Sequence, residues 1–579
     1  MMTGAEILID ALKKEGVDIV FGYPGGVVLP VFDVLFKTPE IRVVLTRHEQ
    51  AAVHAADGYA RATGRTGVCL VTSGPGATNT ITGLANAKLD SIPIVVISGQ
   101  VKTAVIGTDA FQEADMAGLT RPICKHSYLV QRVEDLPQVL KNSFYIARSG
   151  RPGPVAVDLP ADVAQAPLEN YAYPEHPDIP SYQPPEKGNA NQIRKLAAAV
   201  KQASRPVILA GGGIVAAGAS AELVRFAEKT NIPVATTLMA LGCVPDDHEL
   251  FLGMPGMHGR VSANYALMEC DLLIGMGTRF DDRVTGDLKS FAAGATIAHV
   301  DIDPSEIGKI LRTQIPIVGD VRSVLADLDK AVAPRPANEW NRIVREWSLV
   351  HPLSYVQDPE GEILPQYVID RVNLQASKDT IIATDVGQHQ MWSALFVRHR
   401  GPRAFLSSGG MGTMGFGLPA AMGASLGFPD RPVVVITGDG SIQMNIQELP
   451  TCTLNRIPVK IVVLNNSCLG MVRQWQELFY DGHYSKTCLK ERPECRSVCS
   501  GHRPDCPNAF WPDFVRVAEA NGMPGFRATR VSEVDEVLCK GFAVDGPALM
   551  EFRVKKIENV YPMVPGGKPI NVILLGAAR

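Results

Sequence analysis

The sequence has no apolar run that approaches the roughly 18 residues of a membrane-spanning helix. It also has no basic patch, and its formal net charge is −4. This charge argues against nucleic acid as a partner. The first residues lack the basic region of a signal peptide. Together with a hydrophobic content of 46%, these absences predict a soluble globular protein without membrane contact.

The eleven cysteines are an odd number, and most of them lie in segments that resemble strands or helices. This distribution favours free thiols in a reducing cytoplasm, so we expect a cytoplasmic protein. Four cysteines cluster in an apparent insert at 485–509, namely Cys488, Cys495, Cys499 and Cys506. Their spacing fits no zinc-ribbon pattern well. A surface thiol loop is the favoured interpretation, and a metal or iron–sulfur site is the alternative.

Short apolar segments alternate with helical stretches along the whole chain, which predicts an α/β fold. A length of 579 residues allows three or four domains. We expect three doubly wound domains with mostly parallel sheets, joined by proline-rich linkers. The predicted order is an N-terminal domain at 1–165, a linker at 166–191, a central domain at 192–333, a linker at 334–362 and a C-terminal domain at 363–579.

Polar loops follow three expected strands of the N-terminal domain, at 17–21, 43–45 and 68–72. The second loop contains Glu49. An isolated glutamate after a strand is usually a solvated cap, but Glu49 precedes an alanine-rich helix at 51–56 that has a buried composition. A buried carboxylate must be paired or take part in chemistry, so Glu49 is a candidate functional residue.

The central domain carries glycines and acidic residues at the ends of its expected strands, 207–210, 272–274 and 298–303. This arrangement suits a nucleotide. The full G-x-G-x-x-G pattern is absent, so a plain structural domain stays open as the alternative.

In the C-terminal domain, the stretch 438–466 lies between two β-branched apolar runs that predict neighbouring buried strands. Ile446, Leu449 and Leu454 lie at helical spacing between the runs, which predicts a βαβ unit. Ligands of such sheets bind at the carboxyl ends of the strands.

Asp439 and Asn466 each follow one of these two runs. A carboxylate and an amide oxygen are hard ligands with little charge, which suits a Mg²⁺ ion that holds a phosphate. Gly438 and Gly440 would let backbone approach closely. An ordinary pair of turns is the alternative interpretation of these residues.

The order GDG, 24 residues, NN resembles the diphosphate-binding motif of thiamine diphosphate enzymes. Further motifs over nearly the whole chain resemble the catalytic subunit of acetohydroxyacid synthase, also called acetolactate synthase. These motifs are FGYPGG at 21–26, RHEQAA at 47–52, SGPGATN at 73–79, GTDAFQEAD at 107–115, GRPGPV at 150–155, GMHG at 256–259, RFDDRVTG at 279–286, GTMGFGLPAA at 412–421, NNSCLGMVRQWQ at 465–476 and ENVYPMVPGG at 558–567.

The resemblance implies thiamine diphosphate, Mg²⁺ and FAD as cofactors. Asp439, Asn466 and the backbone oxygen of Cys468 would bind Mg²⁺. Glu49 would hydrogen-bond the pyrimidine ring across a subunit interface, and Met414 would enforce the bent shape of the cofactor. The full thiamine diphosphate set comprises Glu49, Pro75, Asn79, Val386, Gly387, Gln388, His389, Gly412, Met414, Gly438, Asp439, Gly440, Ser441, Asn466, Cys468, Gly470 and Met471.

In this family the flavin is structural and is not reduced during turnover. The residues that match its site are Arg151, Gly211, Gly212, Gly213, Thr237, Leu238, Met257, His258, Gly277, Arg279, Asp281, Arg283, Val284, Asp301, Ile302 and Asp320. The resemblance thus places FAD in the central domain.

The resemblance implies that pyruvate is decarboxylated and joined to a second 2-oxo acid, pyruvate or 2-oxobutyrate. The products would be 2-acetolactate and 2-aceto-2-hydroxybutyrate, formed in the first common step of branched-chain amino-acid biosynthesis. Arg279 would grip the acceptor carboxylate, because a guanidinium binds it bidentately, and Trp475 would favour 2-oxobutyrate. The catalytic set comprises Gly26, Glu49, Phe111, Gln112, Arg279, Met414, Met471 and Trp475.

The implied assembly is a homodimer or homotetramer with its active site at the subunit interface, and a small regulatory subunit is an open further partner. Glyoxylate carboligase is a rival interpretation, but that enzyme has an apolar residue in place of Glu49. Pyruvate oxidase is another, against which Trp475 and RFDDRVTG argue. A non-catalytic flavoprotein on the same fold is a third, and Glu49, Asp439 and Asn466 argue against it.

Overall fold

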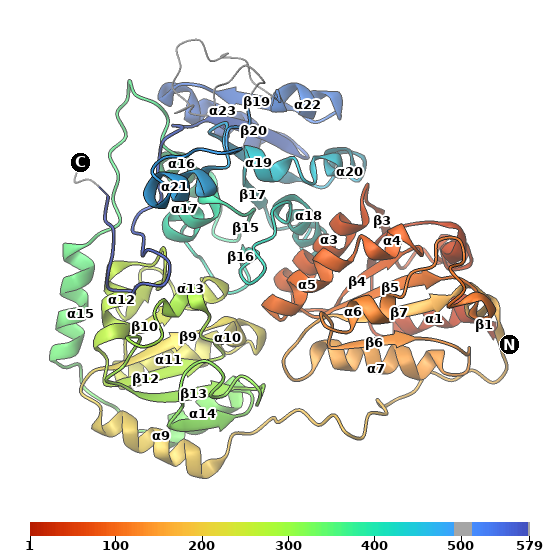
Figure 1. Cartoon of the computed structure of the whole chain (residues 1–579), viewed down its shortest axis with the longest axis horizontal. Helices are drawn as coiled ribbons and strands as arrows, with labels where there is room; N and C mark the ends of the chain where they lie inside the picture. Colours follow the sequence, from red (N-terminus) through yellow and green to blue (C-terminus); the bar gives the residue numbers. More distant parts are fainter. Residues whose placement is uncertain (491–511, 577–579) are drawn as a thin grey trace.

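The computed structural model describes residues 1–490 and 512–576. Each of its three domains is built on a six-stranded sheet whose neighbouring strands are all parallel (Figure 1). Each sheet has one buried apolar cluster on either face, because helices cover both sides. The predicted three doubly wound α/β domains with parallel sheets are therefore confirmed.

The N-terminal domain has the sheet order β3-β2-β4-β5-β7-β6. Thr3 caps its first helix and forms a capping box with Glu6, and Gly16 follows the end of the helix with φ +75°. The elements are β1 Met2–Thr3, α1 Gly4–Lys14, β2 Ile19–Tyr23, η1 Gly26–Val28, α2 Leu29–Phe36, β3 Arg42–Leu45, α3 Glu49–Thr63, β4 Gly67–Val71, α4 Pro75–Thr78, α5 Ile81–Asp90, β5 Ile94–Gln100, η2 Thr103–Val105, α6 Met116–Thr120, β6 His126–Leu129, α7 Leu136–Arg148, β7 Val155–Pro160 and α8 Ala161–Gln165.

The central domain has the sheet order β11-β10-β9-β12-β13-β14. It occupies the yellow to green part of Figure 1. Its elements are α9 Ala190–Gln202, β9 Pro206–Ala210, α10 Gly212–Ala216, α11 Ser220–Thr230, β10 Val234–Thr236, η3 Leu238–Ala240, β11 Phe251–Gly253, α12 Val261–Glu269, β12 Leu272–Met276, α13 Asp282–Thr285, β13 Thr296–Asp301, β14 Ile315–Val318 and α14 Val321–Ala331.

The C-terminal domain has the sheet order β16-β15-β17-β18-β20-β19. Its elements are α16 Pro365–Gln375, β15 Ile381–Thr384, α17 Gln388–Phe396, β16 Phe405–Leu406, α18 Gly417–Gly427, β17 Val433–Gly438, α19 Asp439–Ile442, η4 Ile446–Glu448, α20 Leu449–Leu454, β18 Val459–Asn465, α21 Gly470–Phe479, α22 Phe514–Ala520, β19 Gly525–Ala528, η5 Val531–Glu533, α23 Val534–Ala543 and β20 Ala548–Arg553.

Both segments expected to be linkers contain regular structure. In the first, β8 (Pro167–Leu168) pairs antiparallel with β1. In the second, α15 (Glu339–Val350) is capped by Asn338 and buries Trp340 against the central domain. The segment between β17 and β18 forms the three short helices α19, η4 and α20. The prediction of one continuous helix with a single apolar face is therefore wrong. Leu454, the last residue of α20, is 70% exposed.

Helices α3 and α18 hold the N-terminal and C-terminal domains together, and they form the most extensive helix contact of the described chain. The two backbones touch at glycines. A Cβ on Gly58 would lie 2.1 Å from the carbonyl oxygen of Ala420, and one on Gly423 would lie 1.9 Å from that of Ala55. Glycine is thus required at both positions for this close approach.

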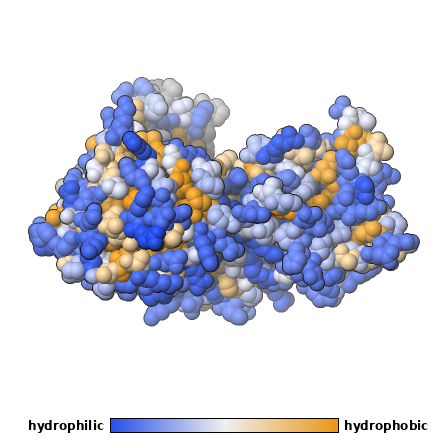
Figure 2. Space-filling model, turned by 90° about the horizontal axis from the view of Figure 1, so that it is seen from below, coloured by the Kyte–Doolittle hydropathy of each residue, from blue (hydrophilic) through white to orange (hydrophobic). Residues whose placement is uncertain are grey.

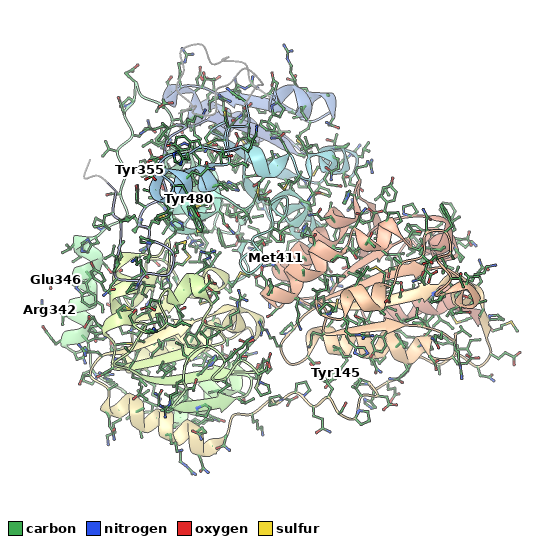
Figure 3. The ribbon with its side chains drawn as sticks, in the orientation of Figure 1. Tyr145, Arg342, Glu346, Tyr355, Met411 and Tyr480 are labelled. Carbon is green, nitrogen blue, oxygen red and sulfur yellow. The ribbon has the colours of Figure 1, made fainter. Side chains whose placement is uncertain are left out.

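The three domains meet around Met411, which lies near the centre of the molecule (Figure 3). Seen from below, the surface is mostly hydrophilic, with a few apolar patches and a depression between two lobes (Figure 2). No helix within residues 1–490 or 512–576 is long and apolar enough to cross a membrane.

Candidate active site

The carboxyl ends of β17 and β18 bring Asp439 and Asn466 to the same edge of the sheet. The strands pair in parallel, with Gly438 opposite Leu464. Asp439 is 4% exposed. Burial raises the pKa of its carboxyl to about 7, although the backbone N–H groups of Ser467 and Gly440 donate to it and lower the pKa. The Oδ1 atom of Asn466 accepts the N–H of Cys468 at 3.1 Å. A buried carboxylate beside an amide oxygen forms an oxygen-rich corner of the kind that Mg²⁺ binds.

His389 lies beside this corner in a cradle made by two glycines. A Cβ on Gly438 would lie 2.7 Å from His389 Nδ1, and one on Gly387 would lie 3.0 Å from its Cε1. The ring is buried, and burial lowers its pKa to about 3, so it is neutral at physiological pH. Its Nε2 atom is buried without a hydrogen-bond partner. Such an atom calls for a polar ligand, and the residues present therefore fit a diphosphate held by Mg²⁺.

Gln388 has a structural role that the sequence did not indicate. Its Nε2 donates to Gln474 Oε1 and to the backbone oxygen of Glu558, both at 2.9 Å. Its Oε1 accepts from Asn466 Nδ2 at 3.4 Å. The side chain thus ties the Asn466 loop to α21 and to the C-terminal segment.

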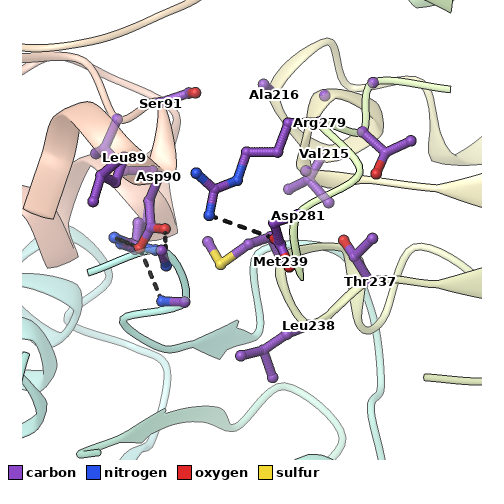
Figure 4. A pocket seen from close by; sticks show the side chains of 18 of the residues that line it. Leu89, Asp90, Ser91, Val215, Ala216, Thr237, Leu238, Met239, Arg279 and Asp281 are labelled. Carbon is purple, nitrogen blue, oxygen red and sulfur yellow. Dashed lines mark hydrogen bonds and ion pairs between the residues drawn. The ribbon is translucent and has the colours of Figure 1, made fainter. Parts of the chain in front are cut away.

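A cavity of about 1250 Å³ opens between the three domains (Figure 4). Every residue of the predicted FAD set except Gly211 lines it. The lining also contains Val386, Gly387, Gly412, Met414, Met471 and Trp475 from the C-terminal domain. The Nε2 atom of His258, another lining residue, is buried without a partner. The cavity exceeds the range of about 300–1,000 Å³ that is usual for small-ligand pockets, so it can hold a larger ligand.

Arg279 lies in this cavity where the three domains meet (Figure 4). Its guanidinium is 3.4 Å from Asp281 Oδ2. A Cβ on Gly410 would lie 3.2 Å from Arg279 Nη2. The guanidinium is therefore next to the loop 409–414, which carries Met414.

The predicted thiamine diphosphate and catalytic residues of the N-terminal domain are not part of the cavity lining. Glu49 begins α3, and its Oε2 atom accepts from Asn79 Nδ2 at 2.9 Å. Phe111 is 88% exposed. The other members of this group are Gly26, Pro75 and Gln112. The Asp439 corner is also outside the lining, with the further predicted residues Gly438, Gly440, Ser441, Cys468 and Gly470. One chain thus brings together the FAD set but does not unite Glu49 with Met414.

A buried ionic network positions the Met414 loop, and sequence reasoning missed it. The guanidinium of Arg61 pairs with Asp57 on the same helix and with Asp90 at 2.7 Å. Asp90 also accepts the backbone N–H of Gly409 at 3.1 Å and of Gly410 at 2.6 Å. The four-residue spacing of Asp57 and Arg61 was the signal available in the sequence.

Glu448 is a second residue that was missed. Its carboxylate is buried between the domains, where it accepts the backbone N–H of Arg47 at 2.8 Å and the hydroxyl of Thr451 at 2.7 Å. Burial raises its pKa to about 7 against these hydrogen bonds. Glu448 thus joins the loop that carries Glu49 to the GDG–NN stretch.

Three models of one protein family match this chain, one in each of its three domains. Models of the thiamine pyrophosphate enzyme family match residues 2–119 as the N-terminal TPP binding domain, 193–328 as the central domain and 385–552 as the C-terminal TPP binding domain. The acetolactate synthase large subunit of Corynebacterium glutamicum is 48% identical over 572 residues, which cover 98% of this chain and 89% of the relative. The chain belongs to the acetolactate synthase family of thiamine pyrophosphate enzymes.

Other members of the acetolactate synthase family align over a similar extent. The acetolactate synthase large subunit of Haemophilus influenzae is 44% identical over 582 residues, which cover 99% of this chain and 98% of the relative. The acetolactate synthase of Mycobacterium avium is 48% identical over 573 residues, with 98% and 90% covered. The likeness therefore extends over all three domains rather than over the cofactor motif alone.

Proposed function

We propose that this chain is an acetolactate synthase that decarboxylates pyruvate and transfers the two-carbon unit to a second 2-oxo acid. Pyruvate as acceptor gives 2-acetolactate, and 2-oxobutyrate gives 2-aceto-2-hydroxybutyrate. The single observation that carries the proposal is identity of 44–48% to acetolactate synthases along almost the whole chain. The intact Asp439–Asn466 corner supports it.

Thiamine diphosphate, when bound, supplies the electron sink for decarboxylation. Asp439, Asn466 and the backbone oxygen of Cys468 would hold Mg²⁺, and the unpartnered Nε2 of His389 would meet the diphosphate side. The raised pKa of Asp439 supports this assignment, because a buried carboxylate needs a cation to stay charged. Met414 would support the middle of the cofactor from its loop.

FAD would fill the cavity between the domains, with a structural role. The central domain would contact the flavin nucleotide through His258 and Asp301, and the N-terminal domain would contact it through Arg151. Burial raises the pKa of Asp301 to about 6, so its carboxylate suits hydrogen-bond donors such as ribose hydroxyls. The flavin should stay oxidised during turnover, and bleaching at the turnover rate would instead indicate an oxidase.

Glu49 would hold a proton for the pyrimidine ring of the cofactor. Its hydrogen bond from Asn79 fixes the orientation of the carboxylate. Glu49 and the Met414 loop of the same chain do not share a cavity, which supports an active site completed by a second copy in a homodimer or homotetramer. A regulatory subunit and a cytoplasmic location remain predictions.

The proposal is tested by product analysis with pyruvate alone and with added 2-oxobutyrate. We expect acetolactate in the first case and both acetohydroxy acids in the second. Glu49→Gln should slow the reaction by roughly 10²–10⁴-fold, because the amide keeps the shape and loses the proton. Cofactor binding should persist in this variant. Absence of either carboligation product would overturn the proposed activity.

A further inference from the structure

Two cysteines lie opposite each other next to the proposed Mg²⁺ corner. Cys468 follows β18, and Cys488 lies on the segment 485–490, which crosses the loop after β18. The two residues form an isolated antiparallel bridge. Both are free thiols in the structure, Cys468 buried and Cys488 partly exposed.

The backbone hydrogen bonds on either side of the bridge show which type of antiparallel residue pair Cys468 and Cys488 form. The N–H of Leu469 donates to the oxygen of Thr487 at 2.8 Å, and the N–H of Leu489 donates to the oxygen of Ser467 at 3.0 Å. Cys468 and Cys488 therefore form a non-hydrogen-bonded antiparallel pair. In such pairs the Cα atoms are about 4.5 Å apart and the side chains lie on the same face. Disulfides span Cα separations of about 4.4–6.8 Å, so the backbone needs no large movement.

We propose that Cys468 and Cys488 are a site of reversible disulfide formation that clamps the segment 485–490 onto the loop after β18. This modification goes beyond the proposed carboligation and does not depend on it. Cys488 is the entry point, because solvent reaches it and does not reach Cys468. The Nζ atom of Lys556 lies 3.8 Å from Cys488 Sγ.

The oxidant is a low-molecular-weight disulfide, and the exchange is balanced. Cys488 loses its proton and attacks one sulfur of the small disulfide, which releases one small thiol and leaves a mixed disulfide on Cys488. Cys468 then loses its proton and attacks Cys488 Sγ, and the second small thiol leaves. Two protein thiols are oxidised to one disulfide, and one small disulfide is reduced to two thiols.

The clamp would act on the cover of the proposed diphosphate site. A Cβ on Gly440 would lie 2.8 Å from Leu469 Cδ2 and 3.7 Å from both Leu489 Cδ1 and Met414 Cε. Leu489 follows Cys488 directly and thus packs over the GDG turn. A covalent link at 468–488 would hold this side chain on the turn.

The first test treats the full-length protein with oxidised glutathione, blocks remaining thiols and maps peptides by mass spectrometry without reduction. We expect a Cys468–Cys488 cross-linked peptide that lacks two hydrogen atoms and disappears on reduction. Exposed Cys539 should carry only a mixed disulfide, and Cys539→Ser should leave the cross-link unchanged. In Cys488→Ser, Cys468 should stay blockable. A reduced Cys468 in the oxidised wild type, or Cys488 linked to Cys495, Cys499 or Cys506, would overturn the pairing.

The second test measures amide hydrogen exchange of Leu469 and Leu489, whose N–H groups bond across the pair. If the disulfide clamps the segment, both amides should exchange at least about tenfold more slowly in the oxidised protein, because local opening is suppressed. Reduction should restore the original rates. Equal rates in the two forms would show that the bond does not clamp the segment.

Discussion

The backbone N–H of Arg47 donates to Glu448 Oε1 at 2.8 Å, although the two residues are 401 positions apart in the sequence. This hydrogen bond fixes the loop that carries Glu49, two residues further on, against the C-terminal domain. Glu448 acts through that loop and is therefore a positioning residue for the proposed proton holder.

We expect Glu448→Ala to lower kcat at saturating cofactor and pyruvate by about tenfold or more, because small displacements of a catalytic group cost rate steeply. Glu448→Gln should stay within about threefold of wild type, since an amide oxygen can still accept from Arg47. Steady-state kinetics on both variants provides the measurement. Equal kcat values for the alanine variant and the wild type would remove Glu448 from this role.

Asp90 should be important for stability and for the Met414 loop. Its carboxylate faces Arg61 and two backbone N–H groups in a buried site. Asp90→Asn should lower the free energy of unfolding by roughly 3–5 kcal/mol, because it leaves part of the Arg61 charge unpaired. The control is Glu40→Gln, which breaks the exposed pair with Lys13 and should leave Tm unchanged. Thermal unfolding of both variants is the measurement. Equal Tm shifts for Asp90→Asn and Glu40→Gln would contradict the prediction.

Much of the fold could be predicted from the sequence, because strands and turns depend mainly on residues that are close together in the chain. The ends of β17 and β18 are an example, because Gly438 and the asparagine pair follow the two β-branched runs directly. The predicted FAD set except Gly211 also converges on one cavity, since its members other than Arg151 follow consecutive strand ends of one sheet. The helix α15 was missed because prolines flank it, although Asn338, Trp340 and Val344 carried a cap and an apolar face.

Contacts between domains could not be predicted in the same way. Nothing in the sequence near Asp90 indicates that it binds backbone 319 and 320 positions further on. The period through Leu449 and Leu454 failed for a different reason. Both residues lie on α20, but a spacing of five positions rotates Leu454 by about 140° from Leu449, so Leu454 faces solvent.

Asp158 should make stability depend on pH. Burial raises the pKa of its carboxyl to about 7, against hydrogen bonds from Ser98 and Gln100. The folded state therefore binds this proton more tightly than the unfolded state. The resulting stabilisation is complete below the unfolded pKa of about 4 and is lost as the pH rises through about 7.

Asp158→Asn should remove this dependence, because the amide stays neutral and the rotatable hydroxyl of Ser98 can accept from it. The variant should gain stability relative to wild type by up to roughly a few kcal/mol between pH 5 and pH 8. Thermal unfolding at both pH values is the measurement. Asp282→Asn, which removes an exposed carboxylate, is the control. A Tm difference between Asp158→Asn and wild type that is the same at both pH values would contradict the prediction.

We expect Trp475 to influence the choice between two acceptors that differ by one methylene. Its half-buried indole lines the cavity, with the guanidinium of Arg283 at 5.7 Å from the ring and the edge of Phe479 packed against it. The alternative role is that of an ordinary packing residue of α21, since Met471 and Phe479 lie at helical spacing from it. The position in the cavity favours a role in substrate selection.

One methylene in an apolar pocket is worth about 1–3 kcal/mol, or roughly 10–200-fold in selectivity. Trp475→Leu should therefore lose preference for 2-oxobutyrate while the rate with pyruvate stays near normal. The matched control is Trp347→Leu, because Trp347 is also half-buried and packs edge-on against Tyr265 and Trp340. It lies outside the cavity lining, so its loss should lower both products together. The ratio of acetohydroxybutyrate to acetolactate in competition between the acceptors is the measurement, and an unchanged ratio in Trp475→Leu would exclude the pocket role.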